Sequence, residues 1–105
     1  MITVTVLYRN TDALKFNMNY YLNTHIPLIN KLLGSALKDV MVQHGLSGGA
    51  PGSKPEFLVI TVLKFDSVES YQGAFGPHAP AVMGDLPNFC SEPPTIQISD
   101  VRLGG

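Results

Sequence analysis

The alternation of apolar and polar positions predicts one long amphipathic helix, from about residue 17 to residue 33. Within it, apolar side chains recur at three- and four-residue intervals, the period of one helical face. Pro27 cannot donate a backbone hydrogen bond, and its ring would clash with the carbonyl of Asn23. We therefore expect a distorted turn beside His25. The apolar face has His25 in its middle and comprises Met18, Tyr21, Leu22, Leu28, Ile29 and Leu32.

Four further segments carry strand patterns. Residues 2–9, 37–46 and 95–101 alternate between apolar and polar side chains, and residues 57–65 are apolar on both faces, as is typical of a central strand. The glycine- and proline-rich segment 47–55 predicts a hairpin loop between the second and third strands. A second helix is expected after Asp66 or Ser67, interrupted at Gly76-Pro77 and followed by a short helical turn.

This order predicts a single α+β domain, residues 1–105, with the ferredoxin-like β-α-β-β-α-β arrangement. Right-handed crossovers place segments 2–9 and 57–65 in the middle of a four-stranded antiparallel sheet, with both helices on one face. The other face still carries apolar side chains from segment 57–65, which predicts packing against a second copy. That set is either Leu58, Ile60 and Val62, or Phe57, Val59, Leu63 and Phe65.

Composition supports a homodimer and excludes some partners. Charged residues make up 14% of the chain, against about 25% in ordinary globular domains, so the surface is short of charge. A net charge of -1 gives no basic field for nucleic acid or anionic lipid. No run has membrane-spanning length, the N-terminal segment does not resemble a signal peptide, and one cysteine allows no internal disulfide. We therefore expect a cytoplasmic protein.

His25 is the first candidate for chemistry because its imidazole shares a face with apolar side chains. One interpretation is a hydrogen-bonded core histidine. The other is a general base, since an imidazole among apolar groups stays mostly neutral and can accept a proton near pH 7. The expected distortion, the Tyr20-Tyr21 pair and the absence of a neighbouring charged residue in the sequence bring the two interpretations close together.

The other histidines predict no metal site. His44 ends the second predicted strand beside the glycine-rich loop, as either an exposed edge residue or a second catalytic group. His78 follows Pro77 in the interrupted helix, where a structural role is favoured. None of the three histidines has the His-x-x-x-His or Glu-x-x-His spacing of a metal site, so we expect no metal.

Three more residues have alternative interpretations. Tyr8 closes the first strand, where sites often form, but it is also interpretable as a rim aromatic with its hydroxyl in water. Asp85 precedes Leu86-Pro87 and is either a turn-forming residue or a carboxylate at the mouth of a pocket. Cys90 has no base at a recognisable spacing, which favours a small buried apolar residue over a nucleophile.

Several stretches together resemble the EthD family of the dimeric α/β-barrel superfamily. They are Tyr20-Tyr21-Leu22-Asn23-Thr24-His25-Ile26-Pro27-Leu28, His44-Gly45-Leu46 followed by Gly48-Gly49, Phe65-Asp66-Ser67, and Asp85-Leu86-Pro87-Asn88-Phe89. The resemblance implies a ferredoxin-like fold, a dimer formed sheet to sheet, and a pocket between sheet and helices. It also places His25 at the position of the family's helix histidine. The chain departs from the family pattern at Gly76-Pro77-His78-Ala79-Pro80, where a continuous second helix is usual.

The resemblance also implies a class of function. The family is named for a component needed in ethyl tert-butyl ether degradation, and similar proteins include cofactor-independent isomerases, dehydratases and decarboxylases. We therefore expect a catabolic lyase or isomerase without a cofactor, acting on a small hydrophobic carbonyl or ether-derived metabolite. The expected site has His25 and His44 as catalytic residues, with Tyr8, Tyr21, Asp85 and Phe89 binding substrate. The alternatives are an accessory protein that only binds such a metabolite for an oxygenase, and a cofactorless monooxygenase.

Overall fold

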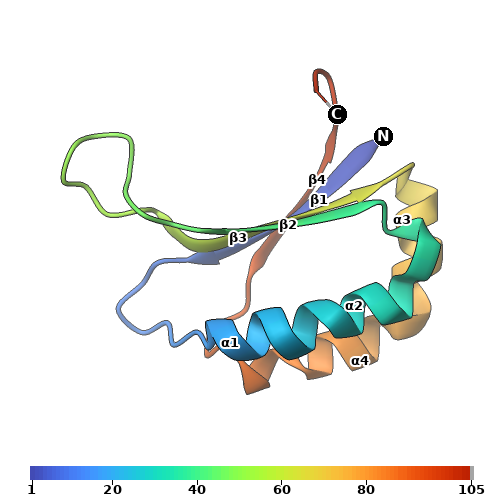
Figure 1. Ribbon diagram of the computed structural model, residues 1–105, viewed down its shortest axis with the longest axis horizontal. Coiled ribbons are helices and arrows are strands. Elements are labelled where there is room, and N and C mark those ends of the chain that lie inside the picture. The colour runs from blue at the N-terminus through green and yellow to red at the C-terminus, as the bar shows by residue number, and fades with distance from the viewer. Residues whose placement is uncertain (105) are drawn as a thin grey trace.

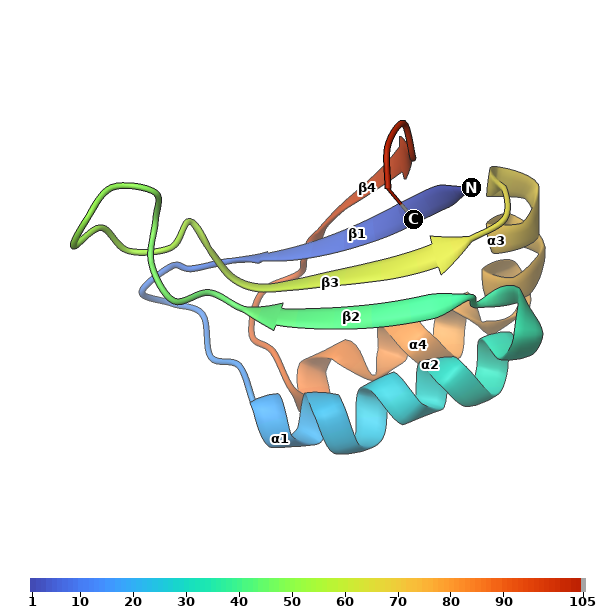
Figure 2. The ribbon, with the colours of Figure 1, turned by 45° about the horizontal axis from the view of Figure 1, so that its top comes forward.

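The sheet of the computed structural model, which describes residues 1–104, has four antiparallel strands in the order β2-β3-β1-β4. The strands are β1 (Ile2–Arg9), β2 (Asp39–His44), β3 (Phe57–Phe65) and β4 (Thr95–Asp100). The two predicted central strands therefore lie in the middle, and the ferredoxin-like fold is confirmed. Figures 1 and 2 show the helices together on one face of this sheet.

The first helix runs without interruption from Met18 to Leu33 but changes its type along the way. It comprises α1 (Met18–Tyr20), a π-helical turn (Tyr21–His25) and α2 (Ile26–Leu33). The side chain of Asn17 caps it by accepting a hydrogen bond from Tyr20 N, and Gly34 ends it at a φ of 57°. A 3₁₀ turn over Gly34–Ala36 then delays β2, which begins at Asp39, two residues after the predicted start.

The second helical region is broken, as predicted, into α3 (Val68–Phe75), a 3₁₀ turn (Gly76–His78) and α4 (Ala79–Gly84). Ser67 is the cap, because its hydroxyl accepts a hydrogen bond from Ser70 N. A further 3₁₀ turn, Leu86–Asn88, follows α4 directly. Within residues 1–104, no helix is both long and apolar enough to cross a membrane.

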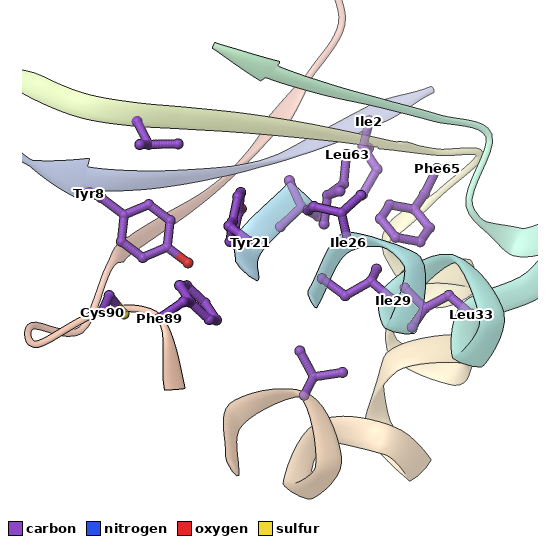
Figure 3. Close-up of a cluster of buried hydrophobic side chains, with 13 residues drawn as sticks. Ile2, Tyr8, Tyr21, Ile26, Ile29, Leu33, Leu63, Phe65, Phe89 and Cys90 are labelled. Atoms are coloured by element: carbon purple, nitrogen blue, oxygen red, sulfur yellow. The ribbon is translucent and has the colours of Figure 1, made fainter. Parts of the chain in front are cut away.

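The burial pattern of β3 decides which apolar face meets the helices. Val59, Thr61, Leu63 and Phe65 are buried beneath them, whereas Leu58, Ile60 and Val62 lie on the opposite face and are only partly covered. The first of the two alternatives for the uncovered apolar set is therefore correct. Figure 3 shows the core between sheet and helices, with Phe65 near α2 at one end and Tyr8 beside Phe89 at the other.

We expect Phe65→Ala to lower the free energy of unfolding by about 3–5 kcal/mol, because Phe65 has no exposed surface and its loss leaves a cavity in the core. Phe57→Ala, at the half-buried opposite end of the same strand, is the matched control and should cost clearly less. Denaturant titration at one fixed protein concentration measures both. Equal losses would contradict this account of the core.

Candidate functional site

The π-helical turn presents His25 and Tyr21 to the interior. Its backbone N–H at Ile26 donates to the carbonyl of Tyr21, one residue further back than in an α-helix. Pro27 next in the chain has no N–H to continue the regular ladder, which favours the wider turn at this place. The distortion predicted beside His25 is thus confirmed, and both residues are at most 2% exposed.

His25 is hydrogen bonded to a carboxylate 60 residues away in the sequence. Its Nδ1 lies 2.9 Å from Oδ2 of Asp85, and the two side chains are 3% and 12% exposed. The other carboxylate oxygen, Oδ1, accepts hydrogen bonds from the hydroxyl of Tyr20 at 2.6 Å and from Nδ2 of Asn88 at 2.9 Å. Three donors therefore hold this carboxylate in place.

The surroundings of the pair fix its charge state. Burial alone would raise the pKa of Asp85, but the hydrogen bonds from Tyr20, Asn88 and His25 outweigh it and lower that pKa below its ordinary 3.8. Burial lowers the pKa of His25 below its ordinary 6.5, and the Asp85 carboxylate only partly offsets this. Near neutral pH the pair is therefore an ionised carboxylate beside a neutral imidazole.

This charge state also settles the tautomer of His25. An ionised carboxylate can only accept, so Nδ1 carries the ring proton and donates it to Asp85. Nε2 is then unprotonated and able to accept a proton. Aromatic rings lie against the imidazole, with Tyr21 stacked at a centroid separation of 5.5 Å and Phe89 tilted at 4.4 Å.

His25 lines a cavity of about 50 Å³ between the sheet and the helices. Its polar lining groups include His25, Tyr8, Tyr21 and Thr61, and the hydroxyls of Tyr21 and Thr61 are hydrogen bonded to each other at 2.6 Å. No Asp, Glu, Lys or Arg of the described chain lines this cavity. The rest of its wall is apolar or aromatic, comprising Val4, Val6, Ile29, Leu63, Tyr71, Phe75, Val82, Met83, Leu86, Pro94 and Ile96.

Tyr8 and Tyr21, two of the three tyrosines that line the cavity, are neutral donors at physiological pH. Burial raises the pKa of Tyr8, and the neighbouring Tyr21 hydroxyl adds to the rise. Burial also raises the pKa of Tyr21, against the opposing effect of its hydrogen bond to Thr61. The interpretation of Tyr8 as a rim aromatic is wrong, because its side chain is buried and Figure 3 shows its hydroxyl directed toward Tyr21 and Phe89.

The structure brings five of the six predicted site residues together. Tyr8, Tyr21 and His25 line the cavity, while Asp85 and Phe89 lie against the imidazole of His25. Asp85 thus supports His25 instead of standing at the mouth of the pocket. His44 is not part of this group: it is exposed at the end of edge strand β2, opposite Val59, and does not line the cavity.

Sequence analysis did not identify two residues of this cluster, although the sequence contains a signal for each of them. Thr61 is the one polar residue in the apolar run from Phe57 to Leu63. A single hydroxyl within such a run indicates a polar group on a buried face, and Thr61 is 1% exposed. Asn88 follows Asp85 by three residues, a spacing that lets its side chain reach back across a single helical turn. Tyr20, noted only as part of a tyrosine pair, donates the shortest hydrogen bond to Asp85.

The sequence favoured Cys90 as a small buried apolar residue over a nucleophile. Cys90 is buried, its thiol pKa is raised by burial, and its Sγ lies 3.4 Å from the carbonyl oxygen of Leu86. Within residues 1–104, no group of three or more His, Cys, Asp and Glu side chains is arranged to hold a metal ion.

The sequence and the fold are both similar to those of EthD proteins. The model of the EthD domain matches residues 12–93. The crystal structure of an EthD-like protein from Ralstonia eutropha superimposes with a TM-score of 0.92 at 34% identity, over 97% of this chain and 92% of that one. An EthD-family protein from Bacillus halodurans has the same fold at a TM-score of 0.74 and 24% identity, over 96% of this chain and 98% of that one.

A more distant structure also shares the fold. It is a dimeric protein of unknown function with a ferredoxin-like fold from Bacteroides fragilis, with a TM-score of 0.51 at 10% identity, over 95% of this chain and 94% of that one. Among proteins with curated descriptions, none matches this sequence.

We expect acid to weaken folding in two steps that depend on the His25–Asp85 pair. Because folding lowers the pKa of His25, its contribution is fully present above pH 6.5 and is lost as the pH falls through the lowered value. The contribution of Asp85 is present above pH 3.8 and is lost as the pH falls through its own lowered value. Denaturant titrations across this range measure the effect.

The variant His25→Gln should remove the first of these losses, and His44→Gln should retain it because His44 is exposed and lies outside the cluster. A stability curve for His25→Gln that keeps its full decline below pH 6.5 would show that the decline has another origin.

Proposed function

Because the chain belongs to the EthD family, we propose that it is a cofactor-independent lyase or isomerase that moves a proton on a small, uncharged carbonyl compound. The observation that carries the proposal is the His25–Asp85 pair at the buried end of an apolar cavity that also holds hydroxyl donors. A core histidine of purely structural role needs one hydrogen-bond partner, but it needs neither an adjoining cavity nor a second polar group facing it.

His25 is the general base in this mechanism. Its Nε2 removes a proton from the carbon next to the substrate carbonyl, and Asp85 stabilises the imidazolium that forms. Tyr20 and Asn88 act through Asp85 by holding its carboxylate in place, so they are positioning residues. The pKa of His25, lowered by burial, keeps the base unprotonated at neutral pH.

The hydroxyl cluster receives the charge that develops on the substrate oxygen. Two hydroxyls joined by one hydrogen bond, Tyr21 and Thr61, still hold one proton that the bond does not use, and this proton is available to an enolate oxygen. The imidazolium then returns its proton to a different carbon, which gives an isomerase, or to a departing group, which gives a lyase. Both outcomes conserve atoms and electrons without a cofactor.

The absence of Asp, Glu, Lys and Arg from the described cavity lining favours an uncharged substrate. A carboxylate or phosphate would have to leave water without a cation to receive it. Ketones, aldehydes, esters and lactones carry a carbonyl without that cost. This argument, together with the aromatic walls, supports the small hydrophobic metabolite expected from the sequence.

We also propose that the protein is a homodimer formed through the sheet face opposite the helices. Leu58, Ile60 and Val62 of β3 lie on that face, and Met41 of β2, paired with Val62, leaves 48% of its surface exposed. An apolar sheet face of this kind is best covered by an identical face. The Bacteroides fragilis protein of the same fold is described as dimeric, which is consistent with a dimeric state here.

We expect the protein to catalyse exchange of hydrogen for deuterium next to the carbonyl of cyclopentanone in D₂O, because this exchange requires only a base and an oxyanion donor. His25→Asn should slow the exchange by about a hundredfold or more. Asp85→Asn should slow it comparably, because an amide can hold the imidazole in the wrong tautomer. Proton NMR follows the loss of the α-hydrogen signal.

His44→Asn is the control and should leave the exchange rate unchanged, since His44 is exposed and outside the cavity. Binding of cyclopentanone without any exchange above the buffer rate would refute the enzyme and leave the accessory binding protein. Circular dichroism of each variant separates loss of folding from loss of the base.

For assembly, we expect sedimentation of the wild-type protein to give a dimer at micromolar concentration. The variant Val62→Asp should give a monomer or an unfolded chain, because the substitution places a charge in the buried interface. Leu46→Asp, in the hairpin loop where Leu46 is 92% exposed, should remain dimeric. A monomeric wild-type protein at that concentration would contradict the proposed assembly.

A further inference from the structure

The His25 cavity has one exposed end. Of the side chains that line it, the two large ones with substantial exposure are Met83, at 42%, and Ile96, at 45%. At the other end His25, Tyr21 and Thr61 are at most 2% exposed. A ligand that reaches His25 from solvent therefore has its shortest path between α4 and β4, past Met83 and Ile96.

The cavity is too small in this state for the substrates proposed above. Its volume is about 50 Å³. An engineered cavity that binds benzene measures about 150 Å³, and ordinary ligand pockets measure about 300 Å³ or more. A carbonyl compound of five or more carbons therefore enters only if part of the wall moves.

The two sides of the entrance differ in their freedom to move. Ile96 is β-branched and stands on β4, where it pairs with Val6 of the central strand β1. Met83 is unbranched, has three rotatable bonds, and stands on the short helix α4. The Met83 side chain is thus the part of the wall that moves at lowest cost.

The backbone of α4 is less free than this side chain. Asp85 follows Met83 by two residues, and its carboxylate is held by Tyr20, Asn88 and His25. Moving α4 as a unit would strain these hydrogen bonds and displace the partner of the base. Rotation of the Met83 side chain opens the cavity and leaves the His25–Asp85 pair in place.

We propose that Met83 is the movable side and Ile96 the fixed side of the entrance to the His25 cavity, and that together they set the upper size of its ligand. The ligand class is an uncharged cyclic or short-chain carbonyl compound, since the described residues that line the cavity carry no counter-charge. This inference rests on the proposed function for the carbonyl, but the entrance itself is defined by the cavity alone.

The test uses three probes with four variants. Cyclopentane and cyclopentanone have the same ring size and differ in the carbonyl, and cyclooctanone has the same carbonyl on a larger ring. Shifts of the ring C–H signals of His25 in NMR titrations give the affinity of each probe. The variants are Met83→Ala, Met83→Phe, Ile96→Ala and the control Ile98→Ala.

Ile98 is a close match for Ile96. It lies on the same face of β4, is 43% exposed, and does not line the cavity. Each of the four substitutions affects a half-exposed side chain, so the variants should fold, and thermal unfolding checks this.

We expect Met83→Ala and Ile96→Ala to bind cyclooctanone about tenfold more tightly than the wild type does, and Met83→Phe to bind it about tenfold more weakly. Cyclopentane and cyclopentanone should change by less, and Ile98→Ala should match the wild type for every probe. The proposed entrance would be contradicted if cyclooctanone bound with the same affinity to all five proteins. It would also be contradicted if no probe bound to Met83→Ala.

The two proposals fail in different ways. If cyclooctanone responds to Met83 and Ile96 but cyclopentanone binds no more tightly than cyclopentane, the entrance stands and the carbonyl site fails. If cyclopentanone binds more tightly than cyclopentane but no probe responds to residues 83 and 96, the carbonyl site stands and the entrance fails.

Discussion

The hydrogen bond between His25 and Asp85 is the constraint on which the rest of this site depends. An imidazole with 3% side-chain exposure cannot leave its ring N–H donor unpaired without a cost of about 1–3 kcal/mol, and the Asp85 carboxylate satisfies that donor. The same carboxylate accepts a hydrogen bond from Tyr20, one turn earlier on the same helix. Two donors from the first helix therefore fix the position of the segment that follows α4, and Asn88 of that segment completes the arrangement. Among the described residues, no side-chain nitrogen or oxygen atom that is fully shielded from solvent lacks a hydrogen-bond partner.

The widened turn before Pro27 connects this pair to the sheet. Tyr20 and Tyr21 are consecutive, so their side chains leave the helix in different directions. Tyr20 reaches Asp85, whereas Tyr21 reaches Thr61 in the middle of β3. One short stretch of helix is thus bonded both to the α4 side of the core and to the sheet. This arrangement brings the imidazole of His25 and the hydroxyls of Tyr21 and Thr61 to the lining of one cavity.

Burial serves stability and the proposed chemistry through the same physical effect. Removing water from the imidazole lowers the pKa of His25, which keeps the ring neutral in the core and leaves Nε2 able to accept a proton. Removing water from Tyr8 and Tyr21 raises the pKa of each phenol, which keeps both as donors. The apolar walls that make these residues compatible with folding also make the cavity a poor environment for charged ligands. One small core thus contains both a neutral imidazole and neutral hydroxyl donors.

The sequence by itself determined the elements, because their signals are local. The alternation of side chains placed β1, and a run apolar on both faces placed β3, at their observed bounds. Pro27 predicted a distortion that took the form of a π-helical turn. Only the tertiary structure decided which face of β3 meets the helices, since both faces are apolar and either could be buried. Only the tertiary structure paired His25 with Asp85 and separated it from His44, because the paired groups are 60 residues apart in the sequence. Contacts across such a distance depend on how the crossovers pack helices on the sheet, and no local pattern of side chains encodes that packing.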